Sequence, residues 1–281
     1  MASTGKRGLS SGEMSRVNLE SWSLVTVTYN SAAMLREYWS NVRLPSEVEW
    51  IVVDNASADD SVEVARQLGA RVISLTRNVG FGTANNIGFR SSESKFVGFL
   101  NPDVSPKLED LIELEEVIIS TAGIVAPQLT NPDGSLQPNG RGYPFLFDKV
   151  RNRLDPSGAD SSYRIFASAK EDVPVVWFMG AVVLGTREQL ENLGPWDERF
   201  FVYYEDSDLG LRAAAAGLPR TVTGRVRWVH GWARETSKLA VGPWVRELPS
   251  MVKFYSRYPR LLSLRPDSAK KKIASLGWPR P

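Results

Sequence analysis

The sequence predicts an α/β protein whose mostly parallel sheet, of the nucleotide-binding type, carries helices on both faces. Short β-branched runs alternate with helical patterns through the first hundred residues, which is typical of strand–helix–strand units. Polar residues directly follow several of these runs, and such sheets bind ligands at the carboxyl ends of their strands. With 281 residues and 42% apolar content, the chain can bury one sizeable core or two modest ones.

The elements follow in order along the chain. Strands are expected at 23–28, 50–54, 71–75 and 95–100, with helices at 32–42, 59–69, 81–92 and 108–120. Asp59 or Asp60 caps the second helix and Gly69 ends it. The segment 127–172 is rich in Pro, Gly and Ser, and we expect a long mobile loop there. Further on, 226–230 resembles a strand and 241–258 a helix with an aromatic face.

Three strand ends are polar, and at any one of them a helix cap would explain a single carboxylate. The first strand ends in Thr28, Tyr29 and Asn30, and the second in Asp54. The fourth ends in Asn-Pro-Asp at 101–103. Three polar ends at one edge of a sheet favour a binding site over unrelated caps.

The tripeptide Asn-Pro-Asp occurs twice, and its two settings differ. The copy at 101–103 follows an apolar strand, where Pro102 cannot continue the ladder, so Asp103 is expected to project over the sheet edge. The copy at 131–133 lies among polar residues and precedes Gly134, a combination typical of a β-turn. We therefore predict a site residue at Asp103 and an ordinary turn at Asn131-Pro132-Asp133.

Composition excludes several classes of function. The chain has no cysteine, which excludes disulfides, thiolate metal sites and cysteine nucleophiles and fits a cytoplasmic protein. The first 20 residues are predicted to be a loose tail rather than a signal peptide, and no run approaches the roughly 18 apolar residues of a membrane span. The sequence Gly80-Phe81-Gly82 fails the dinucleotide fingerprint because Asn85 stands where its third glycine belongs.

The last residues of the chain are strongly basic. Residues 251–281 carry eight Lys and Arg against one Asp, although the whole chain has a formal net charge of only +2. Aromatic and leucine side chains lie between these charges, so the tail suits an anionic membrane surface; a solvated basic terminus is the alternative. A nucleic-acid partner is not expected, because the rest of the chain is slightly acidic and contains no groove-reading motif.

The ordered motifs VTYN, VVDNASADDS, RNVGFGTANNIGF, FLNPD, WFMGAVVLGTREQLENLGPWDERFFVYYEDSDLGLR and VRWVHGW resemble the family 2 glycosyltransferases of GT-A fold. Within that family they are most similar to the bacterial rhamnosyltransferase-like branch. The resemblance implies a tail at 1–20, a GT-A domain at 21–235 and a helical, basic extension at 236–281. The domain would consist of a nucleotide-sugar half, 21–126, and an acceptor and catalytic half, 127–235.

The resemblance also implies a donor site. Asp54 would accept a hydrogen bond from the imide N–H of uracil or thymine, as suits a group that only accepts. The other donor-binding residues would be Thr28, Tyr29, Asn30, Asn78, Gly80, Asn85, Asn101 and Asp103. Asp103 corresponds to the last carboxylate of the family's Asp-x-Asp motif, whose first position here is Asn101. With His230, the only histidine, Asp103 would hold a divalent cation, Mg²⁺ or Mn²⁺.

For catalysis, the resemblance implies that Asp206, paired with Glu205, is the general base of an inverting transfer. The structural alternative is capping, because carboxylates are favoured at the start of a helix. Asp208 is expected to have only that structural role. Trp177, Trp196 and Tyr204 would bind the acceptor sugar by stacking, with core packing as the alternative for each.

The function implied is transfer of a sugar, L-rhamnose from dTDP-rhamnose, to a glycan or lipid-linked acceptor of the bacterial cell surface. A UDP-hexose donor, a non-catalytic nucleotide-sugar-binding protein and a scaffold of polysaccharide assembly remain alternatives. The expected location is the cytoplasm, with contact at the inner face of the membrane through 251–281 left open. The helix before the tail could instead pair two subunits in a homodimer.

Overall fold

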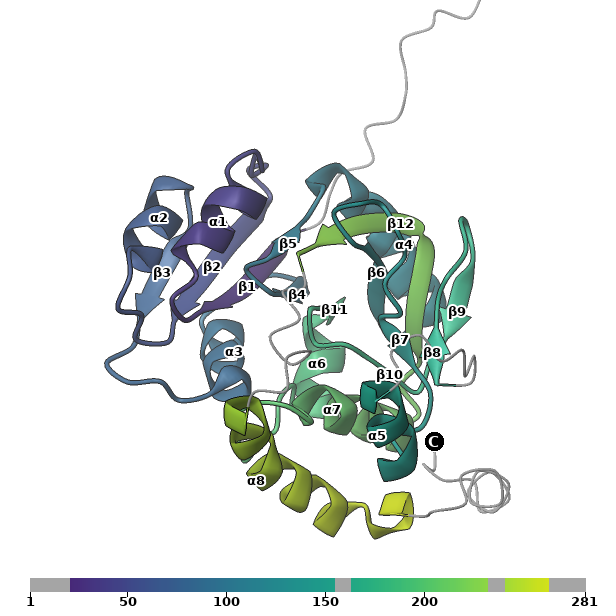
Figure 1. The fold of residues 1–281 in the computed structure, drawn as a ribbon. Helices are drawn as coiled ribbons and strands as arrows, with labels where there is room; N and C mark the ends of the chain where they lie inside the picture. The colour runs from purple at the N-terminus through teal and green to yellow at the C-terminus, as the bar shows by residue number, and fades with distance from the viewer. Residues whose placement is uncertain (1–20, 155–162, 232–240, 263–281) are drawn as a thin grey trace, which may run out of the picture.

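A mixed sheet forms the centre of the protein in the computed structural model, which describes residues 21–154, 163–231 and 241–262. Within these ranges the sheet has nine strands in the order β3-β2-β1-β4-β11-β6-β12-β5, with β9 also paired to β12 (Figure 1). The strands are β1 (Trp22–Thr28), β2 (Val48–Asp54), β3 (Arg71–Ser74), β4 (Phe96–Leu100), β5 (Val104–Ser105), β6 (Ile124–Thr130), β9 (Asp172–Pro174), β11 (Val182–Thr186) and β12 (Arg220–His230).

The first half of the sheet confirms the expected strand–helix alternation. Strands β3, β2, β1 and β4 are parallel to one another, and they are connected through α1 (Ala32–Trp39), α2 (Ser61–Gln67) and α3 (Phe81–Arg90). Gly69 follows α2 with φ 92°, a left-handed conformation that favours glycine at the end of a helix. Parallel strands place their carboxyl ends at one edge, so the predicted polar strand ends meet there.

Helices cover both faces of the sheet, as predicted. Alternate residues of β1 belong to two separate hydrophobic clusters, Leu24 to one and Val25 to the other, because successive side chains of a strand point to opposite faces. The first cluster includes residues of α1, α2 and α4 (Leu111–Thr121). The second includes residues of α3, α6 (Arg187–Leu193) and α7 (Glu205–Ala215). A one-turn 3-10 helix, η1 (Leu108–Asp110), precedes α4.

The prediction of an irregular loop over 127–172 is wrong for the part of that segment that the structure describes. It contains most of β6, then β7 (Gly140–Arg141), helix α5 (Leu146–Leu154), β8 (Arg164–Ile165) and the start of β9. Strands β7 and β8 join β10 (Trp177–Phe178) in a small antiparallel sheet of order β10-β7-β8. Pairing with β10, which lies far along the chain, stabilises short strands whose own sequence carries little periodic signal.

The predicted aromatic helix is present as α8 (Val241–Arg257), followed by the 3-10 helix η3 (Pro259–Leu262). Phe254 and Tyr255 are buried in a third cluster with Phe145, near the start of α5, and with Tyr204 and Leu211. In Figure 1, α8 runs along the side of α7 and α5. Much of the aromatic face is therefore used within the chain. The basic residues beyond 262 lie outside the described part, within which no helix is long and apolar enough to cross a bilayer.

Candidate active site

Asp54 lies at the predicted sheet edge, where it is opposite Thr28 in the register of β1 and β2. Its carboxylate is 2% exposed and accepts hydrogen bonds from the Thr28 hydroxyl, at 2.9 Å, and from the Ser57 hydroxyl and main-chain N–H. A carboxylate has about four acceptor positions. Three are used, so one remains for an N–H donor such as the imide of a pyrimidine base.

The residues after β1 lie at the same sheet edge as Asp54. Tyr29 is 53% exposed, and its ring is therefore available to a ligand. Asn30 has φ 54°, and its side-chain oxygen accepts from the Ala58 N–H at 2.7 Å. Ser57 donates to Asp54 and accepts from the Asn30 N–H, so it links the two strand ends. The sequence analysis did not single out Ser57. Its position three residues after Asp54 is the feature of the sequence that could have indicated this contact.

The glycine-containing segment before α3 is also fixed at this edge. The Asn55 side-chain oxygen accepts a hydrogen bond from the Val79 N–H at 2.8 Å, and its amide nitrogen donates to the Gly80 carbonyl. The Asn78 side-chain oxygen accepts from the Gly80 N–H. Gly80 has φ 91°, and a Cβ there would lie 2.6 Å from the Phe201 carbonyl oxygen. Glycine is therefore required at position 80 because its backbone lies close to Phe201, in the segment that leads into α7. Asn85 is buried and donates to the Phe81 carbonyl within its own helix.

Asp103 and His230 are brought together by the pairing of β5 with β12, in which Val104 is opposite His230. The distance from Asp103 Oδ1 to His230 Nε2 is 3.4 Å, and the His230 side chain is 4% exposed. His230 Nδ1 lies 2.8 Å from Gln137 Oε1. Asn101 sits two residues before Asp103, and its Oδ1 is buried without a hydrogen-bond partner in the described structure.

These groups fit a divalent cation, although no cluster of three or more His, Cys, Asp or Glu exists among the described residues. A carboxylate oxygen and an imidazole nitrogen face each other, and both are acceptors unless a proton or a metal ion lies between them. The orphaned Asn101 oxygen supplies a further hard donor at the same edge. Asp103, His230 and Asn101 are therefore the residues that would hold the ion.

The two Asn-Pro-Asp copies have the structures predicted for them. At the second copy the Gly134 N–H donates to the Asn131 carbonyl at 2.9 Å, which closes a β-turn. Among the described residues, Asp133 binds only Ser135 of the same turn. Asp103, in contrast, projects toward His230.

A strained turn leads into α7 and the predicted acid–base pair. Tyr203 and Tyr204 have φ values of 67° and 70°, a region that costs a non-glycine residue roughly 1–3 kcal/mol. The Tyr204 ring packs against Phe254 and Tyr255 of α8, so tertiary packing maintains the strain. Backbone strain of this kind is concentrated at functional sites.

Glu205 and Asp206 have different environments. Glu205 is buried, with one carboxylate oxygen unpartnered among the described residues. Burial, and secondly the negative charge of Asp206, raise the pKa of Glu205 to about 8. Asp206 accepts from the main-chain N–H groups of Ser207, at 2.6 Å, and Gly180, at 3.4 Å. At neutral pH Glu205 therefore carries a proton, and Asp206 is the better candidate for a base.

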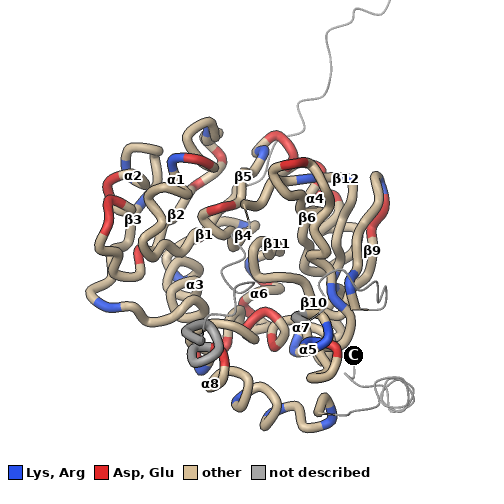
Figure 2. Tube along the Cα trace, in the orientation of Figure 1, with Lys and Arg blue, Asp and Glu red and all other residues tan. Residues whose placement is uncertain are grey.

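Sequence reasoning missed Lys149, which reaches this pair from α5. In the tube of Figure 2, α5 carries blue basic segments and lies beside α7. Its ammonium donates to the Ser207 hydroxyl at 3.0 Å, and that hydroxyl contacts Asp206 Oδ1 at 3.2 Å. The ammonium also lies 3.8 Å from the centre of the Tyr204 ring. Burial lowers the pKa of Lys149 to about 8. The segment around Lys149 carries no motif, so only the structure reveals this contact.

The raised pKa of Glu205 predicts a pH-dependent stability. Folded Glu205 keeps its proton up to about pH 8, whereas the unfolded side chain loses it near pH 4.3. The free energy of unfolding should therefore fall as the pH rises from about 5 to about 7.5, by up to about 1.4 kcal/mol per pH unit. Urea unfolding across this range should show the slope in the wild type and a flatter one in Glu205→Gln. Equal slopes would contradict the assignment.

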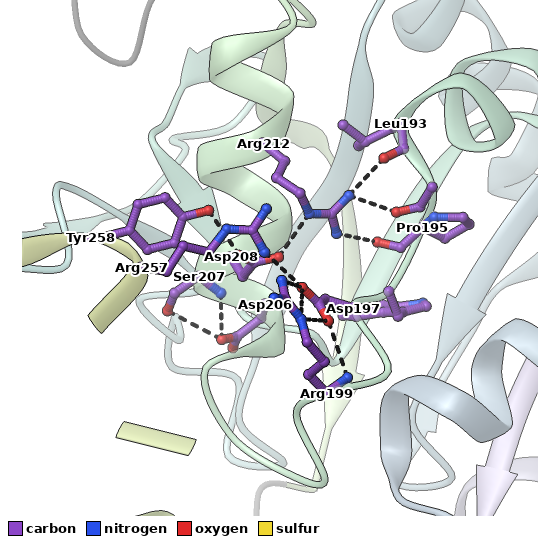
Figure 3. Close-up of polar contacts among 12 residues, drawn as sticks. Leu193, Pro195, Asp197, Arg199, Asp206, Ser207, Asp208, Arg212, Arg257 and Tyr258 are labelled. Carbon is purple, nitrogen blue, oxygen red and sulfur yellow. Dashed lines mark hydrogen bonds and ion pairs between the residues drawn. The ribbon is translucent and has the colours of Figure 1, made fainter. Parts of the chain in front are cut away.

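Asp208 has a structural role, but the expectation that it is a helix cap is wrong, because no described side chain caps the start of α7 and Asp208 instead pairs with arginines. It is fully buried and binds Arg212 at 2.7 Å, Arg257 at 3.2 Å and the Tyr258 hydroxyl at 2.8 Å. Arg212 also donates to three main-chain carbonyls before the strained turn, those of Leu193, Gly194 and Pro195. Figure 3 shows the contacts of Asp208 with Arg212, Arg257 and Tyr258. Asp206 and Ser207, which precede Asp208 in α7, are drawn in the same view. The network attaches the end of α8 to the helix that carries the acid–base pair.

Replacing Asp208 with Ala should lower the free energy of unfolding by about 3 kcal/mol, because two arginines lose a buried carboxylate. Denaturant unfolding measures this loss. The exposed pair of Asp60 and Arg36, at 2.9 Å, offers a matched control, and Asp60→Ala should cost less than about 1 kcal/mol. Similar losses in the two variants would show that the Asp208 network does not hold α8 in place.

The predicted acceptor residues Trp177, Trp196 and Tyr204 are all buried, with exposed fractions of 5%, 2% and 4%. Trp196 packs edge-on against Phe81 and Phe99, so core packing accounts for its position. Trp177 borders the Arg141 and Lys149 cations, and its indole N–H has no acceptor in the described structure. A role of these rings in acceptor binding remains a prediction.

Arg141, which the sequence offers as a contact for an acidic or diphosphate-bearing acceptor, is a buried cation near Asp206. It is 5% exposed, and its guanidinium donates to the Gly140 carbonyl and to the Met179 sulfur. No carboxylate within the described residues forms an ion pair with it. Burial lowers its pKa.

Comparison with known proteins gives consistent results. The family model described as glycosyl transferase family 2 matches residues 23–173. An N-acetylglucosaminyl-diphospho-decaprenol L-rhamnosyltransferase of Mycobacterium tuberculosis is 28% identical over 237 residues, covering 76% of this chain and 77% of that protein. The rhamnosyltransferase WbbL of Escherichia coli is 28% identical over 153 residues, covering 50% of this chain and 56% of WbbL.

Among solved structures, the mannosyltransferase PcManGT of Pyrobaculum calidifontis, in complex with GDP-Man and Mn²⁺, superposes with a TM-score of 0.59 and 19% identity. The similarity covers 87% of this chain and 65% of PcManGT. At this identity it bears on the fold alone, and it confirms the predicted GT-A architecture.

Proposed function

The chain belongs to glycosyl transferase family 2, and from that premise we propose that it is an inverting rhamnosyltransferase. Its donor would be dTDP-rhamnose, and its acceptor a glycan or lipid-linked glycan of the bacterial cell surface. The observation that carries the proposal is the Asp103–His230 pair at 3.4 Å. The Asp54 carboxylate with a free acceptor position and the Glu205–Asp206 pair at the start of α7 support it. The names of the relatives support rhamnose as the sugar.

The donor would bind along the edge of the sheet. Asp54 would accept the imide N–H of the pyrimidine, and the exposed Tyr29 would cover the nucleotide. The diphosphate would lie toward Asp103, His230 and Asn101. A divalent cation held by these residues would offset the negative charge that develops on the diphosphate leaving group.

The reaction would be a single displacement. An acceptor hydroxyl attacks the anomeric carbon as the bond from that carbon to the diphosphate oxygen breaks, and Asp206 takes the hydroxyl proton. Ser207 and Gly180 hold the Asp206 carboxylate through their N–H groups. Because attack comes from the face opposite the leaving group, the configuration at the anomeric carbon is inverted. The protonated Glu205 does not compete as a base.

The acceptor side would include Trp177, Arg141 and Lys149. The buried Arg141 and the partly buried Lys149 place two positive charges near Asp206. These charges suit an acceptor that carries phosphate, and the name of one relative includes such an acceptor, a diphospho-decaprenol. A lipid-linked acceptor would require the protein to work at the inner face of the membrane, where the basic residues of 251–281 would contact anionic lipid.

Calorimetric binding of dTDP-rhamnose and UDP-glucose, each with Mn²⁺, Mg²⁺ or chelator, tests the proposal. We expect dTDP-rhamnose to bind best and to need the metal ion. Preference for UDP-glucose would indicate a hexosyltransferase of the same family. Binding without transfer to a diphospholipid-linked acceptor would favour a non-catalytic binding protein, and no binding at all would favour a scaffold of polysaccharide assembly.

A further inference from the structure

The imidazole of His230 is held from both of its nitrogens. Nε2 faces the Asp103 carboxylate at 3.4 Å, and Nδ1 lies 2.8 Å from Gln137 Oε1. Gln137 is fully buried, and its main-chain N–H donates to the Leu129 carbonyl. It lies between the second Asn-Pro-Asp copy and β7, in a segment without a recognised motif.

The orientation of the Gln137 amide follows from a group that can only accept. Gln137 Nε2 lies 2.8 Å from the main-chain carbonyl oxygen of His230 and 2.9 Å from Asn131 Oδ1. A carbonyl oxygen requires a donor, so the nitrogen end of the amide must face it. The oxygen end then faces His230 Nδ1, which must carry a proton to make the 2.8 Å contact. The lone pair of neutral His230 is therefore on Nε2 and is directed toward Asp103.

We propose that Gln137 is a positioning residue that fixes His230 in the Nδ1–H tautomer, with Asn131 holding the Gln137 amide. In this tautomer the nitrogen beside Asp103 is free to bind a cation, an assignment that rests on the proposed function. Partners that orient a metal-binding histidine in this way act through its second nitrogen. The tautomer itself is a property of the apo protein.

The proposal gives the second Asn-Pro-Asp copy a role beyond its turn. Asn131 anchors the turn through its main chain, and its side-chain oxygen accepts from Gln137 while its amide nitrogen donates to Ser135. Asp133 contributes only to the turn. Both copies therefore act on His230, through Asp103 at Nε2 and through Asn131 and Gln137 at Nδ1.

The ¹⁵N spectrum of the imidazole tests the proposal directly. The chain has one histidine, so a full-length protein with a histidine-free purification tag gives a single imidazole signal set. At about pH 9, well above the ordinary imidazole pKa of about 6.5, the wild-type apo protein should show a protonated Nδ1 and a bare Nε2. Gln137→Met, similar in size but without the amide, should lose this tautomer, and Asn131→Ala should weaken it. Asp133→Ala is the control and should leave it unchanged.

A wild-type spectrum showing the Nε2–H tautomer would overturn the proposal, and this result does not depend on whether any variant folds. So would an unchanged tautomer in a folded Gln137→Met protein. Titration with Mn²⁺ alone, followed by the electron paramagnetic resonance of the free ion, should show 10- to 100-fold weaker binding in Gln137→Met, about the effect of losing such a partner. Wild-type protein with the Nδ1–H tautomer but without Mn²⁺ binding would refute the metal site of the proposed function and leave the positioning role supported.

Discussion

Replacing Asp206 with Asn is expected to reduce sugar transfer by about 10²- to 10⁴-fold, the usual contribution of a general base, while donor binding is retained. The Asn side chain keeps an oxygen that can accept from the Ser207 N–H, as Asp206 Oδ1 does at 2.6 Å, so the start of α7 should keep its geometry. Only the ability to take a proton is lost. Measurement of the transfer rate with saturating donor, together with calorimetric donor binding, separates the two effects.

Asp133→Asn serves as the control for this experiment, because Asp133 lies in an exposed turn and should not affect transfer. Equal rates in Asp206→Asn and the wild type would remove Asp206 from the mechanism. Loss of donor binding together with transfer would show instead that Asp206 supports the structure of the donor site.

Replacing Asp103 with Ala is expected to abolish the part of donor binding that depends on the divalent cation. Asp103 is the carboxylate that faces His230 Nε2, and its loss leaves one neutral nitrogen and the Asn101 amide to hold the ion. We expect donor affinity in Mn²⁺ to fall by at least about 100-fold, the upper end of what loss of an outer-sphere partner costs, to the value measured in chelator.

The matched control is Asp133→Ala, the same substitution in the second Asn-Pro-Asp copy. It should leave the donor affinity in Mn²⁺ within about twofold of the wild type, because Asp133 binds Ser135 within its own turn. If the two variants lose affinity equally, Asp103 is not part of the ion site.

Local sequence patterns identify much of the proposed donor site. Asp54, Asn101 and Asp103 directly follow apolar strands, and parallel strands bring their carboxyl ends to one edge whatever the details of packing. The turn at Asn131-Pro132-Asp133 was predictable for a similar reason, because it depends on a few adjacent residues and their allowed φ angles. Such features need no distant contact to form.

The region proposed to bind the acceptor was less predictable because its elements are stabilised by distant parts of the chain. Helix α5 and strands β7 and β8 lie in a segment without clear periodicity, and they are held by β10 and by the cluster around Phe254. Lys149 and Arg141 approach Asp206 through these contacts. Burial of Trp196 and Tyr204 is likewise a result of packing that no local pattern shows.

The sequence by itself determined the family, the order of strands and helices in the first half, and the polar residues at the sheet edge, because these depend on periodicity and on short motifs. Only the tertiary structure shows which carboxylate has a raised pKa and which side chain holds His230 Nδ1. The first depends on the burial of Glu205 and the second on a glutamine 93 residues away. Protonation state and tautomer are set by the surroundings of a group in three dimensions, and the identity of the residue does not fix them.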